Sequence, residues 1–463
     1  MRKFIGDKKF YKMVLAVALP LVLQNFITNF VSFLDNIMVG RLGTEEMSGV
    51  AIVGSMIFIF NLSIFGGFSG AGIFTAQFKG KNDWKSIAHT MRYKMYLGII
   101  LVAVSLAIFT FFDEPLIRLF LKESSDNVGD IELTLSFAKE YIRVMLFGLL
   151  PFAAAQMYAS TLRETGNTVM PMTASVISVF TNLVFNYILI FGHFGAPKMG
   201  VRGAALATVI SRFVELAIVA GAVHMRSDKY PFIKGFYRSF KIPLSLIGEV
   251  TKKATPLLFN EVMWSLGQTM LVQSYSTRGL SVVASVNISS TVTNVFAIAM
   301  MSLGVSISIV VGPMLGSGET QKARETADRM IFLSVSLCAF IGAVFALSAP
   351  LFPKIYNTED SVRALAVSFM RISALFMPVD AFNNACYFTL RSGGKTLITT
   401  LFDSVFVWAV NIPIAFCLTR FTQMNIIMIY FIVVASQVIK LSIGFFMVRS
   451  GVWAKNIVDK EMA

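Results

Sequence analysis

The chain has 463 residues, of which 56% are hydrophobic and only 14% are charged, and its mean hydropathy is +0.70. Soluble domains carry about 25% charged residues, so this composition excludes an ordinary soluble protein and indicates a helical membrane protein. The formal net charge of +14 does not point to nucleic acid, because Lys and Arg concentrated in cytoplasmic loops account for it.

Hydropathy predicts an all-α polytopic protein with twelve transmembrane helices. The predicted spans are residues 12–38, 47–77, 92–112, 133–160, 169–192, 201–224, 250–276, 282–315, 328–349, 363–389, 398–419 and 425–448. Basic clusters precede the first span and occupy residues 79–94, 226–253 and 322–329, whereas residues 113–130 are acidic. This alternation predicts that both termini are cytoplasmic.

The two halves of the chain repeat each other in collinear order. The corresponding positions include Pro20 with Pro256, Gly43 with Gly279, Gly80 with Gly316, and Thr161-Leu162-Arg163 with Thr389-Leu390-Arg391. Six spans separate the copies, so we expect two six-helix lobes related by a pseudo-two-fold axis along the membrane normal. The N-lobe is predicted at 1–224, a cytoplasmic linker at 225–249 and the C-lobe at 250–463. Such a duplication favours transport by alternating access.

Acidic side chains inside spans mark candidate ion or substrate sites, because a charge in the bilayer is costly and normally faces protein or a water-filled cavity. Asp35, Glu261 and Asp380 have no local basic partner in the sequence and favour a functional role. Glu215 follows Arg212 by three residues, a spacing that favours a structural ion pair. For Asp403, which is closer to a cytoplasmic end, the structural and functional interpretations are equally open.

Two asparagines add a second signal within the fifth predicted span. Asn182 and Asn186 are four residues apart and therefore share one helix face. Their carbonyl oxygens, together with one carboxylate, would suit a hard cation such as Na⁺. Hydrogen bonding between helices is the alternative, and taken alone the pair slightly favours it.

Patterns for catalysis are missing from the sequence. It contains no phosphate-binding loop and no GxSxG nucleophile elbow, and its three histidines form no metal or triad pattern. Cys338, Cys386 and Cys417 lie in apolar segments and are expected to pack as small hydrophobic residues. We therefore expect a protein that is not an enzyme and needs no cofactor.

Several motifs resemble the multidrug and toxic compound extrusion (MATE) family. They include ALPLVLQNFITNFVSFLDNIMVGRLGTEEMSGVA, LRETGNTVMPM, TPLLFNEVMWSLG and MPVDAFNNACYFTLRSGGKT. The resemblance covers nearly the whole chain. It implies a fold of twelve helices in two lobes and the export of organic cations against an inward H⁺ or Na⁺ gradient.

The resemblance also implies a set of residues for cation coupling and substrate binding: Asp35, Asn182, Asn186, Thr208, Glu261 and Asp380. Asp35 matches the acid of the family's first helix, the two asparagines the fifth-helix polar pair near that acid, and Thr208 a hydroxyl of the sixth helix. The resemblance thus implies a Na⁺ site formed by Asp35, Asn182 and Asn186. Glu261 and Asp380 match the C-lobe acids of the NorM-like branch. In another branch, the second residue of the fifth-helix pair is an aspartate.

These observations predict a secondary active multidrug efflux transporter that exchanges small cationic drug-like substrates for H⁺ or Na⁺. It is expected to be a monomer that crosses the plasma membrane several times and binds no nucleic acid. A flippase for lipid-linked precursors is an alternative within the same superfamily, and an uncoupled channel or receptor is an alternative from another class.

Overall fold

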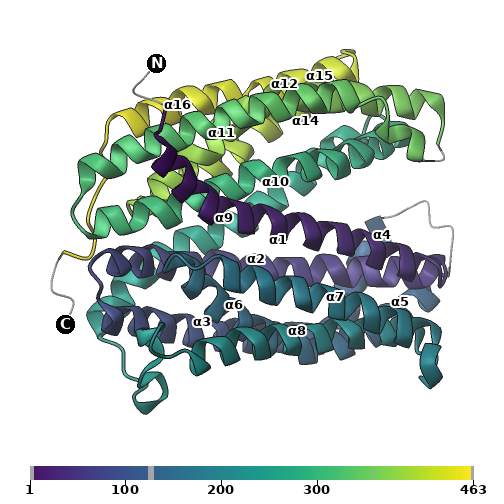
Figure 1. The fold of residues 1–463 in the computed structure, drawn as a ribbon. Coiled ribbons are helices and arrows are strands. Elements are labelled where there is room, and N and C mark those ends of the chain that lie inside the picture. Colours follow the sequence, from purple (N-terminus) through teal and green to yellow (C-terminus); the bar gives the residue numbers. More distant parts are fainter. Residues whose placement is uncertain (1–4, 124–129, 357, 460–463) are drawn as a thin grey trace. The chain divides into compact units, whose positions relative to one another are not determined.

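The computed structural model describes residues 5–123, 130–356 and 358–459 (Figure 1). It is 86% helix, and the residues it describes contain no strand. Residues 1–4 of the predicted basic N-terminus and 124–129 of the predicted acidic loop lie outside the described residues. The prediction of an all-helical polytopic membrane protein is confirmed.

The α-helices, in chain order, are α1 (Lys8–Gly40), α2 (Thr44–Gly80), α3 (Trp84–Phe111), α4 (Asp113–Glu123), α5 (Ile131–Met145), α6 (Leu149–Glu164), α7 (Val169–Phe191), α8 (Gly200–Met225), α9 (Leu244–Ser276), α10 (Leu280–Gly316), α11 (Thr320–Ser348), α12 (Asp360–Ser392), α13 (Thr396–Thr400), α14 (Ile412–Phe421), α15 (Ile426–Ala435) and α16 (Gln437–Arg449). Short 3₁₀ turns are η1 (Leu146–Gly148), η2 (His193–Gly195), η3 (Pro231–Ile233), η4 (Phe236–Arg238) and η5 (Phe352–Ile355), and η6 (Leu401–Val405) and η7 (Val407–Asn411) are π-helical.

Eleven segments of the described chain are long and apolar enough to cross a membrane. The helix α9 corresponds to the remaining predicted span and is 33 residues long. Its hydropathy is lowered by polar side chains in the middle of the helix, among them Asn260, Glu261 and Gln268. A polar helix of this length is tolerated in a membrane when its polar face lies against protein or water.

Contacts divide the chain into two compact units. Unit 1 comprises Met1–Val22, Ala76–Asp83 and Glu249–Ala463, and unit 2 comprises Leu23–Thr75 and Trp84–Gly248. The end of α2 and the start of α1 therefore pack with the C-terminal half of the chain. The lobe boundaries at 224 and 250 stay a prediction.

Within unit 1, the end of α2 lies against the end of α10 with almost no space between the backbones. A Cβ atom on Gly316 would meet the backbone of Gln77, and one on Gly80 would meet the backbone of Pro313. Gly80 and Gly316 are also a corresponding pair of the predicted repeat. Close backbone approach explains why both positions lack a side chain.

Within unit 2, α7 and α8 run side by side (Figure 1) and the segment after α8 folds back onto α3. Phe232 and Phe236 of this segment are buried. Arg92 of α3 donates from Nε to the Phe236 carbonyl at 3.1 Å and from Nη2 to the Gly235 carbonyl at 3.2 Å. The charged linker predicted from the sequence is therefore anchored to unit 2 by buried aromatic rings and backbone hydrogen bonds.

Lys94, a member of the basic cluster at 79–94, is buried like Arg92. Its side chain is completely buried, and its ammonium group pairs with Glu164 Oε2 at 2.5 Å and donates to Ser160 Oγ at 3.0 Å. A buried ion pair offsets the desolvation of both charges only when its hydrogen bonds are well satisfied. Lys94 is thus a structural partner of Glu164 and not an exposed loop charge.

Residues 113–123 of the predicted acidic loop form the helix α4, which the sequence analysis did not predict. In α4, Glu114 accepts from Arg118 at 2.9 Å and pairs with Lys139 of α5. Asp130 caps the N-terminus of α5 by accepting from the backbone N–H groups of Glu132 and Leu133. Ion pairs stabilise α4, and the N-cap aspartate stabilises the start of α5.

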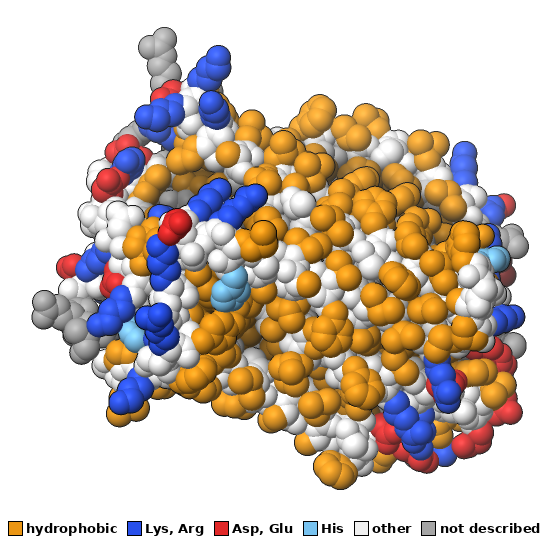
Figure 2. All heavy atoms as spheres, turned by 60° about the horizontal axis from the view of Figure 1, so that its bottom comes forward, with side chains coloured by type: hydrophobic (Ala, Val, Ile, Leu, Met, Phe, Trp, Pro, Cys, Tyr) orange, Lys and Arg blue, Asp and Glu red, His pale blue; other side chains and the backbone are white. Residues whose placement is uncertain are grey.

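Figure 2 shows a broad expanse of hydrophobic side chains on the face drawn, with the charged side chains gathered toward its margins. Large apolar residues are exposed along several helices, for example Phe111 at 77% and Phe147 at 74%. Contiguous apolar surface of this kind is expected where helices contact lipid.

Candidate functional site

A polar cluster in unit 2 joins the residues that the sequence analysis predicted on three different helices. The Asn186 amide of α7 donates to Asp35 Oδ1 of α1 and to Asn182 Oδ1 at 3.0 Å. Asn182 in turn donates to Thr208 Oγ1 of α8 at 3.2 Å. The four side chains form one continuous chain of hydrogen bonds. Because Asn182 and Asn186 are four residues apart, their amides lie on the same face of α7.

Asn186 leaves an acceptor unused in this cluster. Its side chain is 0% exposed, and its Oδ1 has no hydrogen-bond partner in the described part of the chain. Buried polar atoms are nearly always satisfied, so an orphaned carbonyl oxygen beside a carboxylate calls for an explanation. A hard monovalent cation, which prefers carboxylate and carbonyl oxygens, fits these donors.

Tyr141 of α5 belongs to the same cluster and was not predicted. The buried Tyr141 side chain interacts with Thr208 and with the charge of Asp35. A tyrosine inside an apolar span is uncharged, so the sequence does not mark it as a site residue. The packing of α5 against α8 in the structure brings it to the cluster. The hydroxyl adds a polar group to the wall around the carboxylate.

Glu215 of α8 lies apart from this cluster. No ion pair within 4.0 Å joins it to Arg212 among the described residues. Arg212 instead donates to the Gly148 carbonyl at 3.1 Å and lies over the Phe152 ring at 5.0 Å. Glu215 interacts electrostatically with Arg163 and, more weakly, with Arg212. The direct pair expected from the spacing of three residues is therefore replaced by two longer interactions.

A second polar cluster lies in unit 1 and is built around Asp403 of the π-helical η6. Its Oδ1 pairs with the Lys440 ammonium of α16 at 2.6 Å, and its Oδ2 accepts from Asn260 Nδ2 of α9 at 3.2 Å. Asn260 Oδ1 accepts from Ser404 Oγ at 2.7 Å. Both carboxylate oxygens of Asp403 are thus satisfied by protein groups. The sequence analysis did not consider Lys440, although a lysine inside the last predicted span was a readable signal.

The other two predicted acids of unit 1 are Glu261 and Asp380. Glu261 follows Asn260 on α9 and interacts with Tyr387 of α12 and with the charge of Arg391. Asp380, also on α12, makes no hydrogen bond or ion pair that the structure records among the described residues, and the charge of Lys440 acts on it. Tyr387 was not predicted. The three acids of unit 1 therefore meet three different environments.

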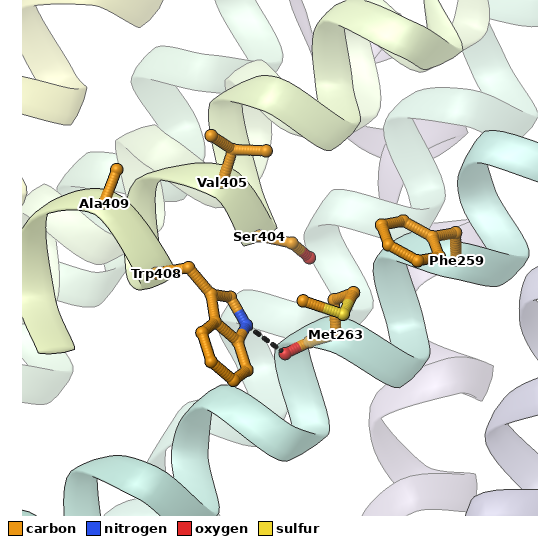
Figure 3. Close-up of a pocket in the computed structure, with 6 residues that line it drawn as sticks. All are labelled: Phe259, Met263, Ser404, Val405, Trp408 and Ala409. Carbon is orange, nitrogen blue, oxygen red and sulfur yellow. Dashed lines mark hydrogen bonds between the residues drawn. The ribbon is translucent and has the colours of Figure 1, made fainter.

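A small cavity of about 240 Å³ opens between α9 and the π-helical segments (Figure 3). Its lining is apolar and aromatic, with one hydroxyl: Phe259, Met263, Ser404, Val405, Trp408 and Ala409. Trp408 Nε1 donates to the Met263 carbonyl at 2.9 Å, which fixes the indole against α9. Since π-helical turns displace side chains from the regular helical register, η6 and η7 bring Ser404 and Trp408 to one wall.

No group of three His, Cys, Asp or Glu side chains that could hold a metal ion occurs in the residues described. In the cluster around Asp35, the oxygens at hand are one carboxylate supplemented by amide and hydroxyl groups. Such oxygen donors suit a weakly bound, exchangeable monovalent cation better than a tightly held transition metal.

Comparison with known proteins identifies relatives over nearly the whole chain. The sequence profile of the MatE family matches residues 20–188 and 256–417. Probable multidrug resistance protein NorM of Thermotoga maritima is 24% identical over 449 residues, which cover 96% of this chain and 94% of the relative. Probable multidrug resistance protein YoeA of Bacillus subtilis is 26% identical over 421 residues, covering 88% and 87%.

Solved structures share the fold. A mutant of the Vibrio cholerae MATE transporter VcmN matches with a TM-score of 0.85 at 17% identity and covers 97% of this chain and 98% of its own. A transporter of the MOP superfamily from Pyrococcus furiosus, described as having a binding pocket of reverse polarity, matches with a TM-score of 0.83 at 18% identity and covers 97% of each chain.

Proposed function

Because the chain is a NorM-like member of the MatE family, we propose that it is a secondary active efflux transporter that exports organic cations in exchange for H⁺ or Na⁺. Its long apolar helices make it a multi-pass membrane protein. We further propose that it acts as a monomer in the plasma membrane with both termini in the cytoplasm.

The cluster around Asp35 is the observation that carries this proposal. Its carboxylate lies within a membrane-spanning helix and is held by an amide hydrogen bond from Asn186. In the described part of the chain, no Lys or Arg side chain pairs with it. An ionised carboxylate without a fixed counter-charge is unfavourable in a membrane unless a cation reaches it.

Exchange follows if two kinds of cation compete for the same negative charge. A proton or Na⁺ at Asp35 neutralises the carboxylate, and the orphaned Asn186 Oδ1 offers Na⁺ a second oxygen ligand. An organic cation binds only when that charge is free. Because a ligand shifts a conformational equilibrium by its differential affinity for two states, competition at one carboxylate links the inward movement of the ion to the outward movement of the drug.

The cavity in unit 1 supports a cargo with an aromatic or apolar body. Phe259, Met263 and Trp408 offer a polarisable surface, and Asp380 supplies negative charge elsewhere in the same unit. Aromatic faces attract organic cations, and methionine surfaces adapt to ligands of varied shape. The names of the two curated relatives given above, both probable multidrug resistance proteins, agree with such cargo.

Ethidium efflux from proteoliposomes tests the proposal when a pH gradient and a Na⁺ gradient are imposed separately, with protein-free liposomes as the control. Efflux driven by either gradient supports the proposal and identifies the coupling ion. If neither gradient moves the dye while the purified protein translocates a fluorescent lipid-linked pyrophosphate, the flippase alternative replaces it.

A further inference from the structure

Lys440 is a buried cation inside the membrane-spanning part of unit 1. Only 10% of its side chain is exposed, and its ammonium group contacts Asp403 Oδ1 at 2.6 Å. It also lies over the Phe402 ring at 4.9 Å, a cation–π distance. Burying an unpaired lysine within a membrane is costly, so the presence of Lys440 and its contacts need an explanation.

The carboxylate of Asp403 is filled from two sides. One oxygen pairs with the Lys440 ammonium group at 2.6 Å, and the other accepts from Asn260 at 3.2 Å. Lys440 comes from α16 and Asn260 from α9, so two helices supply the partners of one acid. The ammonium group therefore takes the position at Asp403 that a free cation would need.

The clusters around Asp35 and Asp403 differ in whether a cationic side chain already contacts the carboxylate. Asp35 in unit 2 is held by an amide and has an orphaned oxygen beside it, whereas Asp403 in unit 1 has both oxygens occupied and a cation already attached. A free monovalent cation would have to displace an ammonium group at Asp403, but would displace none at Asp35.

We propose that Lys440 is a tethered cation that occupies Asp403 and thereby sets how strongly a free monovalent cation binds to unit 1. Lys440 is a positioning residue in this proposal, because it acts through the Asp403 carboxylate. The effect of Lys440 on transport rests on the proposed function, whereas its effect on Na⁺ binding does not. Binding of Na⁺ to the detergent-solubilised protein tests it independently.

The two halves of the ion pair should have opposite effects on Na⁺ binding. Lys440→Met leaves Asp403 without its cation, so Na⁺ affinity should rise. Asp403→Asn leaves an unpaired ammonium group in unit 1, which repels cations, so Na⁺ affinity should fall. In the double variant both charges are lost together, and the affinity should return close to that of the wild type. A purely structural ion pair predicts loss of stability in both single variants and no opposite shift.

The experiment measures the increase in thermal unfolding midpoint on adding NaCl, with choline chloride at equal ionic strength as the reference. For Lys440→Met we expect the half-saturating Na⁺ concentration to fall about tenfold or more, as a removed unit charge at short range predicts. For Asp403→Asn we expect it to rise several-fold. Lys440→Arg keeps the charge and should behave as the wild type, and Lys354→Met, an exposed lysine of unit 1, is the matched control.

Shifts in the same direction for both single variants, or no shift in either, would overturn the proposal and leave the pair a structural contact. If Lys440→Met does not fold, Asp403→Asn and Lys440→Arg still decide the question, because only a tethered cation makes the first weaken Na⁺ binding and the second preserve it. The proposed function can fail separately. If neither the wild type nor any variant exports ethidium but the opposite Na⁺ shifts are present, the proposed function is wrong and the tethered cation stands.

Discussion

Asn186 gives its amide hydrogen to Asp35 and keeps its own carbonyl oxygen free of protein partners within the described chain. One side chain therefore fixes the carboxylate and presents an oxygen next to it. Burying that oxygen unsatisfied costs stability unless a ligand is bound for part of the time. This relationship is the structural basis for placing the coupling cation in unit 2.

The first prediction concerns Asn186 itself. Asn186→Ala removes a hydrogen bond to a charged group, a contribution of about 1.5–3 kcal/mol, and also removes the spare oxygen. We expect gradient-driven ethidium efflux to fall about tenfold or more, since 1.4 kcal/mol corresponds to one factor of ten. The control is Asn36→Ala, an exposed neighbour of Asp35 on α1. Equal efflux rates in the wild type and Asn186→Ala would remove Asn186 from the site.

The second prediction concerns Tyr141, which the structure adds to the cluster. Tyr141→Phe deletes only the hydroxyl, the group that interacts with Thr208. Because a neutral hydrogen bond contributes about 0.5–1.5 kcal/mol, we expect a two- to tenfold reduction in efflux with an unchanged unfolding midpoint. Tyr96→Phe, which loses an exposed hydrogen bond to the Phe240 carbonyl, should transport at the wild-type rate. If both variants behave alike, the hydroxyl of Tyr141 has no special role.

The third prediction tests the close approach of α2 and α10 in unit 1. Gly316→Ala places a methyl group against the backbone of Gln77, and overpacking of this kind costs about 1–3 kcal/mol. We expect a lower unfolding midpoint in detergent. The matched control is Gly54→Ala, also within a long helix, because a Cβ atom there meets nothing within 4 Å. It should be neutral or slightly stabilising. A Gly316→Ala protein as stable as the Gly54→Ala protein would show that the helix ends separate easily.

The fourth prediction concerns pH and the ion pairs of α4. Hydrogen bonds from Lys139 and Arg118 hold the pKa of Glu114 below its ordinary value. Because the pKa of Glu114 is lowered in the folded state, the unfolded chain binds this proton more readily. The ion pairs of Glu114 therefore stabilise the folded protein above the ordinary pKa of a glutamate, and this stabilisation is lost as the pH falls through the lowered pKa. We expect Glu114→Gln to lose less stability than the wild type on acidification.

Thermal unfolding of the two proteins at a series of acidic pH values checks this difference. Concentrated choline chloride should reduce it, because salt screens exposed charges. Parallel pH profiles for the wild type and Glu114→Gln at low salt would mean that the ion pairs of α4 do not form in solution.

The sequence was sufficient to predict the helical fold from long apolar runs, and to single out Asp35 and the pair Asn182 and Asn186 as an acid where acids are costly and two amides one helical turn apart. The family, and the proximity of Asp35 to that pair, were implied by the resemblance. Whether these residues act in transport is still a prediction. The amphipathic helix α4 was missed because its short charged sequence resembles a loop.

Other parts of the site depend on tertiary packing. Asp403 was left open in the sequence analysis because its partners, Asn260 and Lys440, come from α9 and α16, far away along the chain. Lys440 was overlooked because the sequence analysis considered only the acidic residues inside the predicted spans. Tyr141 carries no charge to mark it. The replacement of the expected Arg212 pair by a contact with the Gly148 carbonyl shows that helical spacing alone does not decide which partners meet.

The most direct test of the central claim is ethidium efflux by Asp35→Asn in proteoliposomes, under whichever gradient drives the wild type. The control is Asp228→Asn, the same substitution at an exposed loop residue that pairs with Lys234. If the cation exchanges at Asp35, the Asp35→Asn protein will insert into the membrane and bind detergent normally but will lose gradient-driven efflux, while Asp228→Asn will keep it. Efflux by Asp35→Asn at the wild-type rate would contradict the account.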